Sequence, residues 1–228
     1  MATVDMLDLT CLPAEQQPER LVGALDALPI GNLLEVQTGP MWEAGSRHVL
    51  TALQEQRWGR FDWRPLTKGG DSWLAELVHL GPGDQHSTIH HFFTRDHHRC
   101  DALYAETEGA AQEGDIARMS RLCHRFLVAM AHHFNMEETG LFPAFENRTG
   151  MRQGPTMVMR SEHEQMRGLM QQMHQAAETG DDELLLKAGG TLLFVMQQHN
   201  VKEEQMLYPM SENHLRPADL LLKEVQRL

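Results

Sequence analysis

The sequence predicts an α+β chain of two domains, in which a small β-α-β-α-β-β sandwich precedes an antiparallel four-helix bundle. Before residue 80, short extended and short helical patterns alternate and are separated by turn residues. The stretch LGPGDQHS, which begins at Leu80, breaks this pattern with two glycines around a proline. Residues 88–212 then carry four long stretches with helical periodicity. We therefore expect an α/β domain at residues 1–80, a linker at 81–87 and a helical domain at 88–228.

The first domain is predicted from six short segments with different periodicities. Extended patterns predict four strands, at residues 4–9, 32–38, 60–66 and 72–80. Helical patterns predict two helices, at residues 18–28 and 41–56. The turn residues in PIGN and TKGGD separate neighbouring segments. The order of these segments along the chain is that of a β-α-β-α-β-β sandwich.

The second domain is predicted to contain four helices of several turns each. They are expected at about residues 88–112, 116–145, 155–179 and 183–212. Gly114-Asp115 separates the first pair and Gly180-Asp181 separates the second, and such short connections make neighbouring helices antiparallel. A short closing helix is expected to start at Pro217 and to include the remaining residues. Methionines are expected to form an adaptable apolar lining, among them Met130, Met136, Met170, Met173, Met196 and Met206.

Composition and charge exclude several classes of partner. The formal net charge is −12 and the basic residues are scattered, so a nucleic-acid partner is not expected. The first ten residues lack the basic region and apolar core of a secretory signal, and no apolar run approaches the length that spans a membrane. The three cysteines form no C-x-x-C pair, which is typical of a reducing compartment. We expect a cytoplasmic protein without a membrane partner.

The helical half contains an internal repeat with an offset of 66 residues. HHFNMEETGLFP begins at His132 and QHNVKEEQMLYP begins at Gln198, so that one His-x-x-x-Glu-Glu-x-x-Leu-aromatic-Pro pattern occurs twice. The same offset pairs Asp96-His97 with Glu162-His163. Each half is therefore predicted to be a helix hairpin, with an acid-His pair on its first helix and His-x-x-x-Glu on its second.

This repeat predicts a metal centre in the core of the bundle. A histidine and a glutamate at positions i and i+4 share one helix face, and antiparallel packing brings the histidine of the first helix to the same level. Four imidazoles and two carboxylates are too polar to bury unpaired, whereas metal ions would compensate them. Mixed imidazole and carboxylate ligation suits iron, with manganese or zinc as alternatives. The predicted ligands are His97, His133, Glu137, His163, His199 and Glu203.

Carboxylates that each bridge two metals would give every metal two imidazole nitrogens and two carboxylate oxygens. A solvent-derived oxo or hydroxo group would then be the third bridge between the metals. This arrangement leaves a position open on each metal for a small ligand. The predicted cofactor is therefore a pair of iron ions bridged by Glu137 and Glu203.

Several neighbours of the predicted ligands carry similar side chains. His98 competes with His97 as a ligand, and the 66-residue offset favours His97. His132, Glu138 and Glu204 each follow or precede a predicted ligand and lie about 100° away around the helix. We expect these three side chains on the helix surface or just outside the ligands.

Other residues could assist the ligands from the same helix face or from the helix ends. His90 and Tyr104 lie seven residues on either side of His97, where they could hydrogen-bond a ligand or a bound small molecule. Ordinary packing in the bundle is the alternative for both. Phe142 and Tyr208, each followed by a proline, are expected to shape the helix ends.

These residues give the helical half a resemblance to the hemerythrin-like, or HHE cation-binding, family. The resemblance covers about residues 88–212 through DHHRCD, HFNMEETGLFP, SEHEQMR and HNVKEEQMLYP, which occur in the family's order. It implies a left-handed four-helix bundle with a non-haem di-iron centre that binds oxygen or nitric oxide. The six predicted ligands match the family's ligand positions. The oxygen-carrying hemerythrins have a further histidine one turn after the third-helix ligand, where this chain has Arg167.

The first domain resembles a domain of unknown function related to the TusA-like sulfur carriers and sometimes found fused to hemerythrin-like domains. LDLTCLPAEQQPERL and GGDSWLAEL carry this resemblance. The sulfur carriers have a cysteine beside the first helix, whereas here Ala14 stands at about that place and Cys11 lies earlier. We expect this domain to dock a redox or regulatory protein.

The leading hypothesis for the function is binding of nitric oxide or oxygen, as a scavenger or sensor in nitrosative or oxidative stress, rather than enzymatic turnover. Two carboxylates among four imidazoles make a less anionic site than the four-glutamate centres of ferritin-like oxidases, and this favours ferrous iron. Proteins that repair damaged iron-sulfur centres have a similar ligand set, so iron donation is an alternative. A di-iron oxidase or peroxidase and a bundle with a purely structural zinc are the others.

Overall fold

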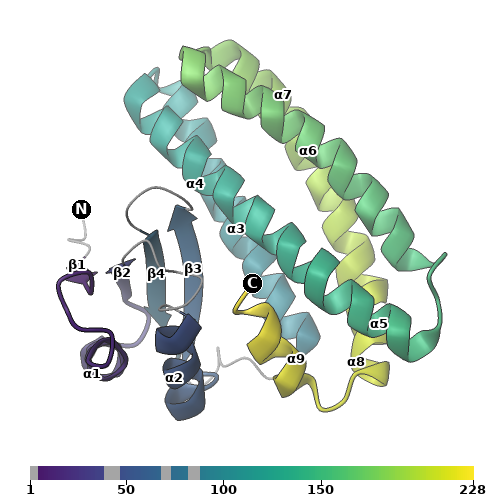
Figure 1. The fold of residues 1–228 in the computed structure, drawn as a ribbon. Helices are drawn as coiled ribbons and strands as arrows, with labels where there is room; N and C mark the ends of the chain where they lie inside the picture. Colours follow the sequence, from purple (N-terminus) through teal and green to yellow (C-terminus); the bar gives the residue numbers. More distant parts are fainter. Residues whose placement is uncertain (1–4, 39–46, 68–72, 82–87) are drawn as a thin grey trace. The chain divides into compact units, whose positions relative to one another are not determined.

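The structure is a computed structural model that describes residues 5–38, 47–67, 73–81 and 88–228. The chain divides into two compact units, one of residues 1–87 and the other beginning at Thr88 (Figure 1). The first unit is mixed α/β and the second is helical, as the sequence predicts. Residues 82–87 of the predicted linker lie outside the described residues, as do residues 41–46 of the second predicted helix.

The described residues of the first unit form one four-stranded sheet and two helices. Its elements are β1 (Asp5–Asp8), α1 (Gln17–Ala27), β2 (Leu33–Thr38), α2 (Arg47–Arg57), β3 (Phe61–Thr67) and β4 (Trp73–His79). The strand order is β1-β2-β4-β3; β1 and β2 are parallel, and the other two pairings are antiparallel. Because parallel strands need a crossover connection, α1 joins β1 to β2. The predicted β-α-β-α-β-β order is confirmed.

The core of this unit follows from the alternation of side chains along the strands. In β2, Leu34, Val36 and Thr38 are buried, whereas the intervening side chains are only partly buried. Leu34 and Val36 share one apolar core with the inward faces of both helices. From the helices this core includes Leu21, Val22, Leu25, Val49, Leu50 and Leu53.

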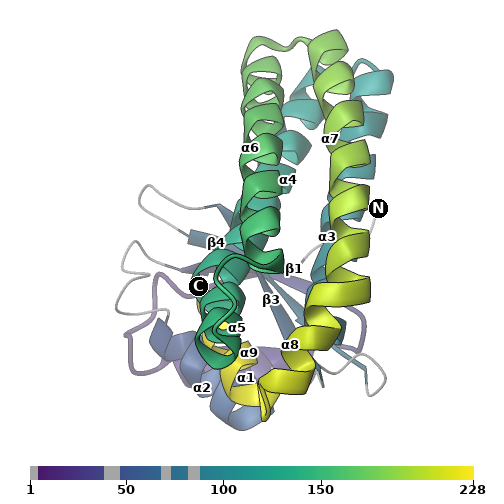
Figure 2. The same ribbon diagram turned by 90° about the vertical axis from the view of Figure 1, so that its right-hand side faces the viewer.

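The second unit is built on four long antiparallel helices. They are α3 (Ile89–Gln112), α4 (Ile116–Asn135), α6 (Pro155–Thr179) and α7 (Asp182–Lys202). Each packs against two others: α4 lies between α3 and α6, and α7 lies between α6 and α3. Figures 1 and 2 show the four helices running alongside one another. The predicted four-helix bundle is confirmed, and its ring of neighbours leaves the inner faces of all four helices directed at a common core.

The two Gly-Asp turns reverse the chain in the same way in both hairpins. Gly114 and Gly180 have φ values of 70° and 69°, in the left-handed region that glycine adopts readily. The aspartate that follows each glycine caps the next helix. Asp115 accepts a hydrogen bond from the backbone N–H of Arg118, and Asp181 accepts one from that of Leu184. Turn and cap together set the register between the helices of each hairpin.

The second and fourth helices contain a π-helical segment, which the predicted uninterrupted α-helices miss. After α4 the chain forms η2 (Met136–Leu141) and then α5 (Phe142–Thr149). After α7 it forms η3 (Glu203–Leu207) and then α8 (Tyr208–His214). The prediction of regular α-helix through residues 145 and 212 was therefore wrong in these two segments.

Hydrogen bonds and proline explain where the π-helical segments lie. The N–H of Phe142 donates to the carbonyl of Glu137, and the N–H of Tyr208 donates to that of Glu203, five residues back in each case. The next residue is proline in both repeats, which has no N–H and cannot continue the usual α-helical ladder. One extra residue is therefore accommodated in the turn that follows each glutamate.

A short closing helix, α9 (Ala218–Val225), packs against η2, and its presence is as predicted. Gly140 provides the space, because a Cβ atom at this position would collide with Cγ1 of Val225. In addition, the side-chain amide of Asn135 donates to the carbonyl of Leu228 at 3.2 Å. The end of the chain therefore covers the π-helical segment that carries Glu137. No helix in the described ranges has the length and apolar composition needed to cross a membrane.

Methionines occupy much of the bundle core. Those predicted to line the core and found buried are Met130, Met136, Met170, Met173 and Met196. Met206 was predicted with them but is 44% exposed. The reason is the π-helical segment: Met206 follows Glu203 by three residues, and the extra residue in that turn rotates it away from the face it would share in an α-helix.

Loss of the Asp181 cap should destabilise the helical unit. We expect Asp181→Ala to lower the free energy of unfolding by about 1 kcal/mol, because the N–H of Leu184 loses its acceptor. Asp181→Asn keeps an accepting oxygen and should change this free energy little. Urea unfolding of the chain, followed by circular dichroism, measures both. Equal losses in the two variants would show that the cap is not the source.

Candidate metal centre

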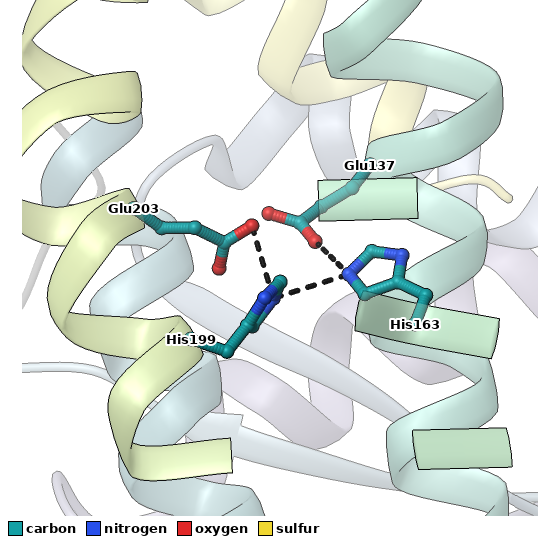
Figure 3. Close-up of side chains that lie close together, drawn as sticks. All are labelled: Glu137, His163, His199 and Glu203. Carbon is teal, nitrogen blue, oxygen red and sulfur yellow. Dashed lines mark hydrogen bonds and ion pairs between the residues drawn. The ribbon is translucent and has the colours of Figure 1, made fainter. Parts of the chain in front are cut away.

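The six predicted ligands converge in the core of the bundle. The four histidines come from four different helices, α3, α4, α6 and α7. Of the two glutamates, Glu137 is the second residue of η2 and Glu203 is the first residue of η3. All six side chains are buried, none more than 3% exposed. Figure 3 shows four of them facing one another: Glu137, His163, His199 and Glu203.

One half of the cluster is formed by the residues in Figure 3, which offer donor atoms within 4.8 Å of one another. The Nε2 atoms of His163 and His199 are 3.1 Å apart. Oε2 of Glu137 lies 3.3 Å from Nε2 of His163, and Oε1 of Glu203 lies 3.2 Å from Nε2 of His199. All four atoms point at a common position.

The other half is formed by His97, His133 and Glu203, again with donor atoms within 4.8 Å of one another. Oε2 of Glu203 lies 3.2 Å from Nε2 of His97. Oε2 of Glu137 lies 3.4 Å from Nε2 of His133. The ring centroids of the two histidines are 4.8 Å apart, as are those of His163 and His199. Each carboxylate therefore contacts one imidazole of each pair, as a bridge between two positions would.

An outer set of carboxylates holds the imidazoles in place. Every one of the four histidines uses Nε2 toward the centre and donates Nδ1–H to an acidic side chain behind it. The pairs are His97 with Glu204 (2.7 Å), His133 with Asp96 (3.0 Å), His163 with Glu138 (2.6 Å) and His199 with Glu162 (2.9 Å). Such carboxylates fix the tautomer and the orientation of metal-binding imidazoles and increase their basicity.

Basic side chains lie behind three of these outer carboxylates. The pairs are Asp96 with Arg99, Glu138 with Arg167 and Glu162 with Lys202. Arg167 occupies the position of the additional histidine of oxygen-carrying hemerythrins, and its guanidinium binds Glu138 at 2.8 Å rather than the centre. Besides the two inner carboxylates expected from the sequence, the centre therefore has four outer carboxylates that are hydrogen-bonded to the imidazoles.

The buried charges of the inner cluster shift one another's pKa. Burial alone would lower the pKa of His97, His133 and His199, yet the facing carboxylates outweigh burial and raise all three. Burial alone would raise the pKa of Glu137 and Glu203, and Glu137 adds to this effect on Glu203, but the imidazoles lower both. The imidazoles and the carboxylates therefore stabilise each other's charged forms.

The donor set fits a metal ion. In the described part of the chain, three inward atoms make no hydrogen bond of acceptable geometry: Nε2 of His133, Oε2 of Glu137 and Oε1 of Glu203. Nitrogen and oxygen ligands about 2.1 Å from one ion stand roughly 3 Å apart, close to the separations of the inner atoms. Neutral imidazole and carboxylate are suitable ligands for iron, manganese and zinc.

The structure adds one residue that the sequence analysis did not assign to the site. The hydroxyl of Tyr208 lies 2.8 Å from Oε1 of Glu137, 3.0 Å from Oε2 of Glu203 and 3.1 Å from Nε2 of His97. In an α-helix the fifth residue after Glu203 would point about 140° away from it. Here the N–H of Tyr208 donates to the carbonyl of Glu203, which closes a wider turn. This turn brings the Tyr208 ring back to the helix face that carries the Glu203 side chain. The proline after each aromatic residue is the sequence signal for this turn.

The remaining predicted neighbours take different places. His98 is exposed, whereas His97 is buried. Tyr104 donates its hydroxyl to Glu108 at 3.3 Å and packs edge-on against Phe126. The ring of His90 stands edge-on to Tyr208, with centroids 6.3 Å apart. The hydrogen bond from His97 is the largest cause that lowers the pKa of Glu204, and the nearby imidazoles of His90 and His98 contribute further.

A small cavity adjoins the cluster on the side of the bundle interior. Its volume is about 10 Å³, which is near the minimum for a single water molecule. It is lined by His97, Cys100, Met130, His133, Phe134, Met196, His199 and Asn200. Three imidazoles therefore border a space whose other walls are mainly apolar.

Comparison with known families assigns the helical unit. Residues 88–211 match the family described as the hemerythrin HHE cation-binding domain, and this match covers more than half of the chain. The chain belongs to the hemerythrin HHE family. Comparisons with curated proteins and with solved structures gave no match. Membership of the family indicates a metal-binding protein, and the buried cluster of histidines and glutamates in the hemerythrin domain is where a cation fits.

Removal of one outer carboxylate should weaken metal binding in the hemerythrin domain. We expect Glu162→Ala to lower the affinity for ferrous iron about 10- to 100-fold, because His199 loses the acceptor that orients it. Competition with a coloured chelator under anaerobic conditions measures this affinity. Glu164→Ala is the matched control, since Glu164 is on the same helix but is exposed and pairs with Arg167 rather than with a histidine of the cluster. Similar losses in both variants would contradict a role for the outer carboxylate.

Metal affinity should depend on pH in a defined direction. The pKa values of His97, His133 and His199 are raised, so these imidazoles hold protons at a higher pH than free imidazole does. Since a metal binds only the deprotonated ring, protons compete with it more strongly as the pH falls. Iron affinity should therefore decrease from about pH 8 to about pH 6, on either side of the ordinary imidazole pKa of ~6.5. Chelator competition in this range measures it, and a pH-independent affinity would contradict the expectation.

Proposed function

We propose that the hemerythrin domain holds two iron ions, one between His97 and His133 and one between His163 and His199. The contacts of Glu137 and Glu203 with both imidazole pairs support two positions that share their carboxylates. When bound, the iron would supply redox-active positions at which a diatomic gas can coordinate. The chain's own residues supply the donors, their orientation and the exclusion of water.

We further propose that the physiological ligand is nitric oxide or oxygen. The observation that carries this proposal is the cavity beside the imidazoles, which has room for only a few atoms and mainly apolar walls. Met130, Met196 and Phe134 form such walls and are each at most 2% exposed. A gas molecule that enters this space gains contacts with apolar walls, while an organic substrate would not fit. The protein would act as a scavenger or sensor of the gas.

Burial of the centre favours this proposal over iron donation. Each of the six ligands is at most 3% exposed, and the outer hydrogen bonds hold the imidazoles in position. An iron donor needs ligands that can exchange with an acceptor protein, and a closed centre of this kind retains its metal. The same closure limits a di-iron oxidase or peroxidase to substrates no larger than the cavity.

Metal analysis and visible absorption of the anaerobically purified chain test the proposal. We expect about two irons per chain and new absorption bands after addition of nitric oxide or oxygen. Glu137→Ala should lose iron and the bands, because Glu137 contacts an imidazole of each pair. Zinc in place of iron, or iron that responds to neither gas, would contradict the proposal. Rapid iron transfer to an apo iron-sulfur protein would indicate a donor, and multiple turnover with a reductant or peroxide would indicate an enzyme.

A cavity-filling variant tests the position of the gas. Met196→Phe should retain two irons but bind the gas more slowly or more weakly, because the larger ring occupies the small space. Met173→Phe is the matched control: Met173 is also buried in the bundle core but does not line the cavity. Stopped-flow absorption compares the three proteins at equal iron content. Unchanged gas binding in Met196→Phe would place the gas elsewhere.

A further inference from the structure

The two halves of the centre differ at one pair of positions. Tyr208 and Phe142 are equivalent under the 66-residue offset and follow the two inner glutamates by five residues each. The hydroxyl of Tyr208 lies 3.1 Å from Nε2 of His97 and contacts both inner carboxylates. Phe142 instead stacks on His163, with centroids 5.8 Å apart and an interplanar angle of 21°, and it offers no polar atom.

The Tyr208 ring is held firmly in this position. It is fully buried and stacks on Phe93, with centroids 5.3 Å apart and an interplanar angle of 26°. His90 packs against it edge-on. Its backbone is fixed by the π-type hydrogen bond to the carbonyl of Glu203. The hydroxyl therefore points at the centre as a consequence of packing as well as of polar contacts.

The spacing around this hydroxyl is that of donors around one ion. Nε2 of His97 and Oε2 of Glu203 are 3.2 Å apart, and the hydroxyl lies 3.1 Å from the first and 3.0 Å from the second. Three donor atoms at roughly 3 Å from one another can bind a common ion about 2 Å from each. His133 belongs to the same group of donors, and Glu137 contacts both His133 and the Tyr208 hydroxyl. This half therefore has five potential protein ligands, one more than the half in Figure 3.

We propose that Tyr208 is a further metal ligand, whose phenol oxygen binds the ion between His97 and His133 and makes the two irons inequivalent. The phenol proton passes to solvent as the bond between oxygen and metal forms, because a metal ligand of this type binds deprotonated. The ion between His163 and His199 has Phe142 at the equivalent place and keeps one protein ligand fewer. This inference rests on the proposed di-iron centre.

Visible absorption and resonance Raman spectra of the diferric protein test this ligand. A phenolate bound to ferric iron gives a charge-transfer band in the visible and enhanced ring vibrations. The chain has two tyrosines, so the signal can be assigned with two isosteric variants. We expect Tyr208→Phe to abolish the band while keeping about two irons per chain. Tyr104→Phe is the control and should keep the band, since the Tyr104 hydroxyl pairs with Glu108.

A gain-of-signal variant provides a second measurement. Phe142→Tyr places a phenol at the equivalent position of the other half and should add a second phenolate contribution to the spectrum. Mössbauer spectra, which also verify that the iron is ferric, should show two inequivalent irons in the natural chain and more similar irons in Phe142→Tyr.

Failure of this inference can be distinguished from failure of the proposed function in the same samples. Two irons per chain without any phenolate signal, or a signal that Tyr208→Phe leaves unchanged, would overturn the tyrosine ligand and leave the di-iron centre standing. A chain that takes up no iron would overturn both. Loss of the band in Tyr208→Phe alone, with the iron retained, supports the inference.

Discussion

Burial of Glu137 and Glu203 is the constraint on which the rest of the helical unit depends. Both carboxylates are fully buried, and burial of an ionised carboxylate is unfavourable unless charge and hydrogen bonds compensate it. The compensation is arranged in layers. Imidazoles surround the two carboxylates, outer carboxylates accept from the imidazoles, and basic side chains such as Arg167 and Lys202 pair with the outer carboxylates near the surface. Alternating charge thus extends from the core to the solvent.

The internal repeat supplies two halves of this arrangement with nearly the same geometry. The imidazole pairs have equal centroid separations of 4.8 Å, and the Gly-Asp turns have the same backbone conformation and caps. The repeat is broken at Phe142 and Tyr208, because one of these side chains is apolar and the other carries a hydroxyl. A polar hydroxyl in one half and an apolar ring in the other give a nearly symmetric scaffold two distinct positions. Symmetry therefore explains the set of inner side chains, and its local loss explains how the two halves of the cluster differ.

The π-helical segments connect the fold to the site. Each begins at or next to an inner glutamate and ends before a proline, and one of them is covered by α9 where Gly140 lacks a side chain. A regular α-helix would keep Glu203 on the face of His199 but would direct Tyr208 elsewhere. The extra residue in the turn lets all three point at the centre. The same turn exposes Met206. The change in helix geometry therefore directs Tyr208 toward the centre and Met206 toward solvent.

The sequence by itself determined the order of elements, the four-helix bundle and the set of inner side chains. These features depend on periodicity, on turn residues such as Gly180-Asp181, and on an offset that can be counted along the chain. Only the tertiary structure decided which donors face each other, how Asp96 and Glu162 hold the imidazoles, and where Tyr208 points. The physical reason is that α-helical spacing alone gives neither the contacts across helices nor the side-chain directions in a helix that departs from 3.6 residues per turn. Proline after each aromatic residue marks the departure, but the direction of a side chain follows only from the packed backbone.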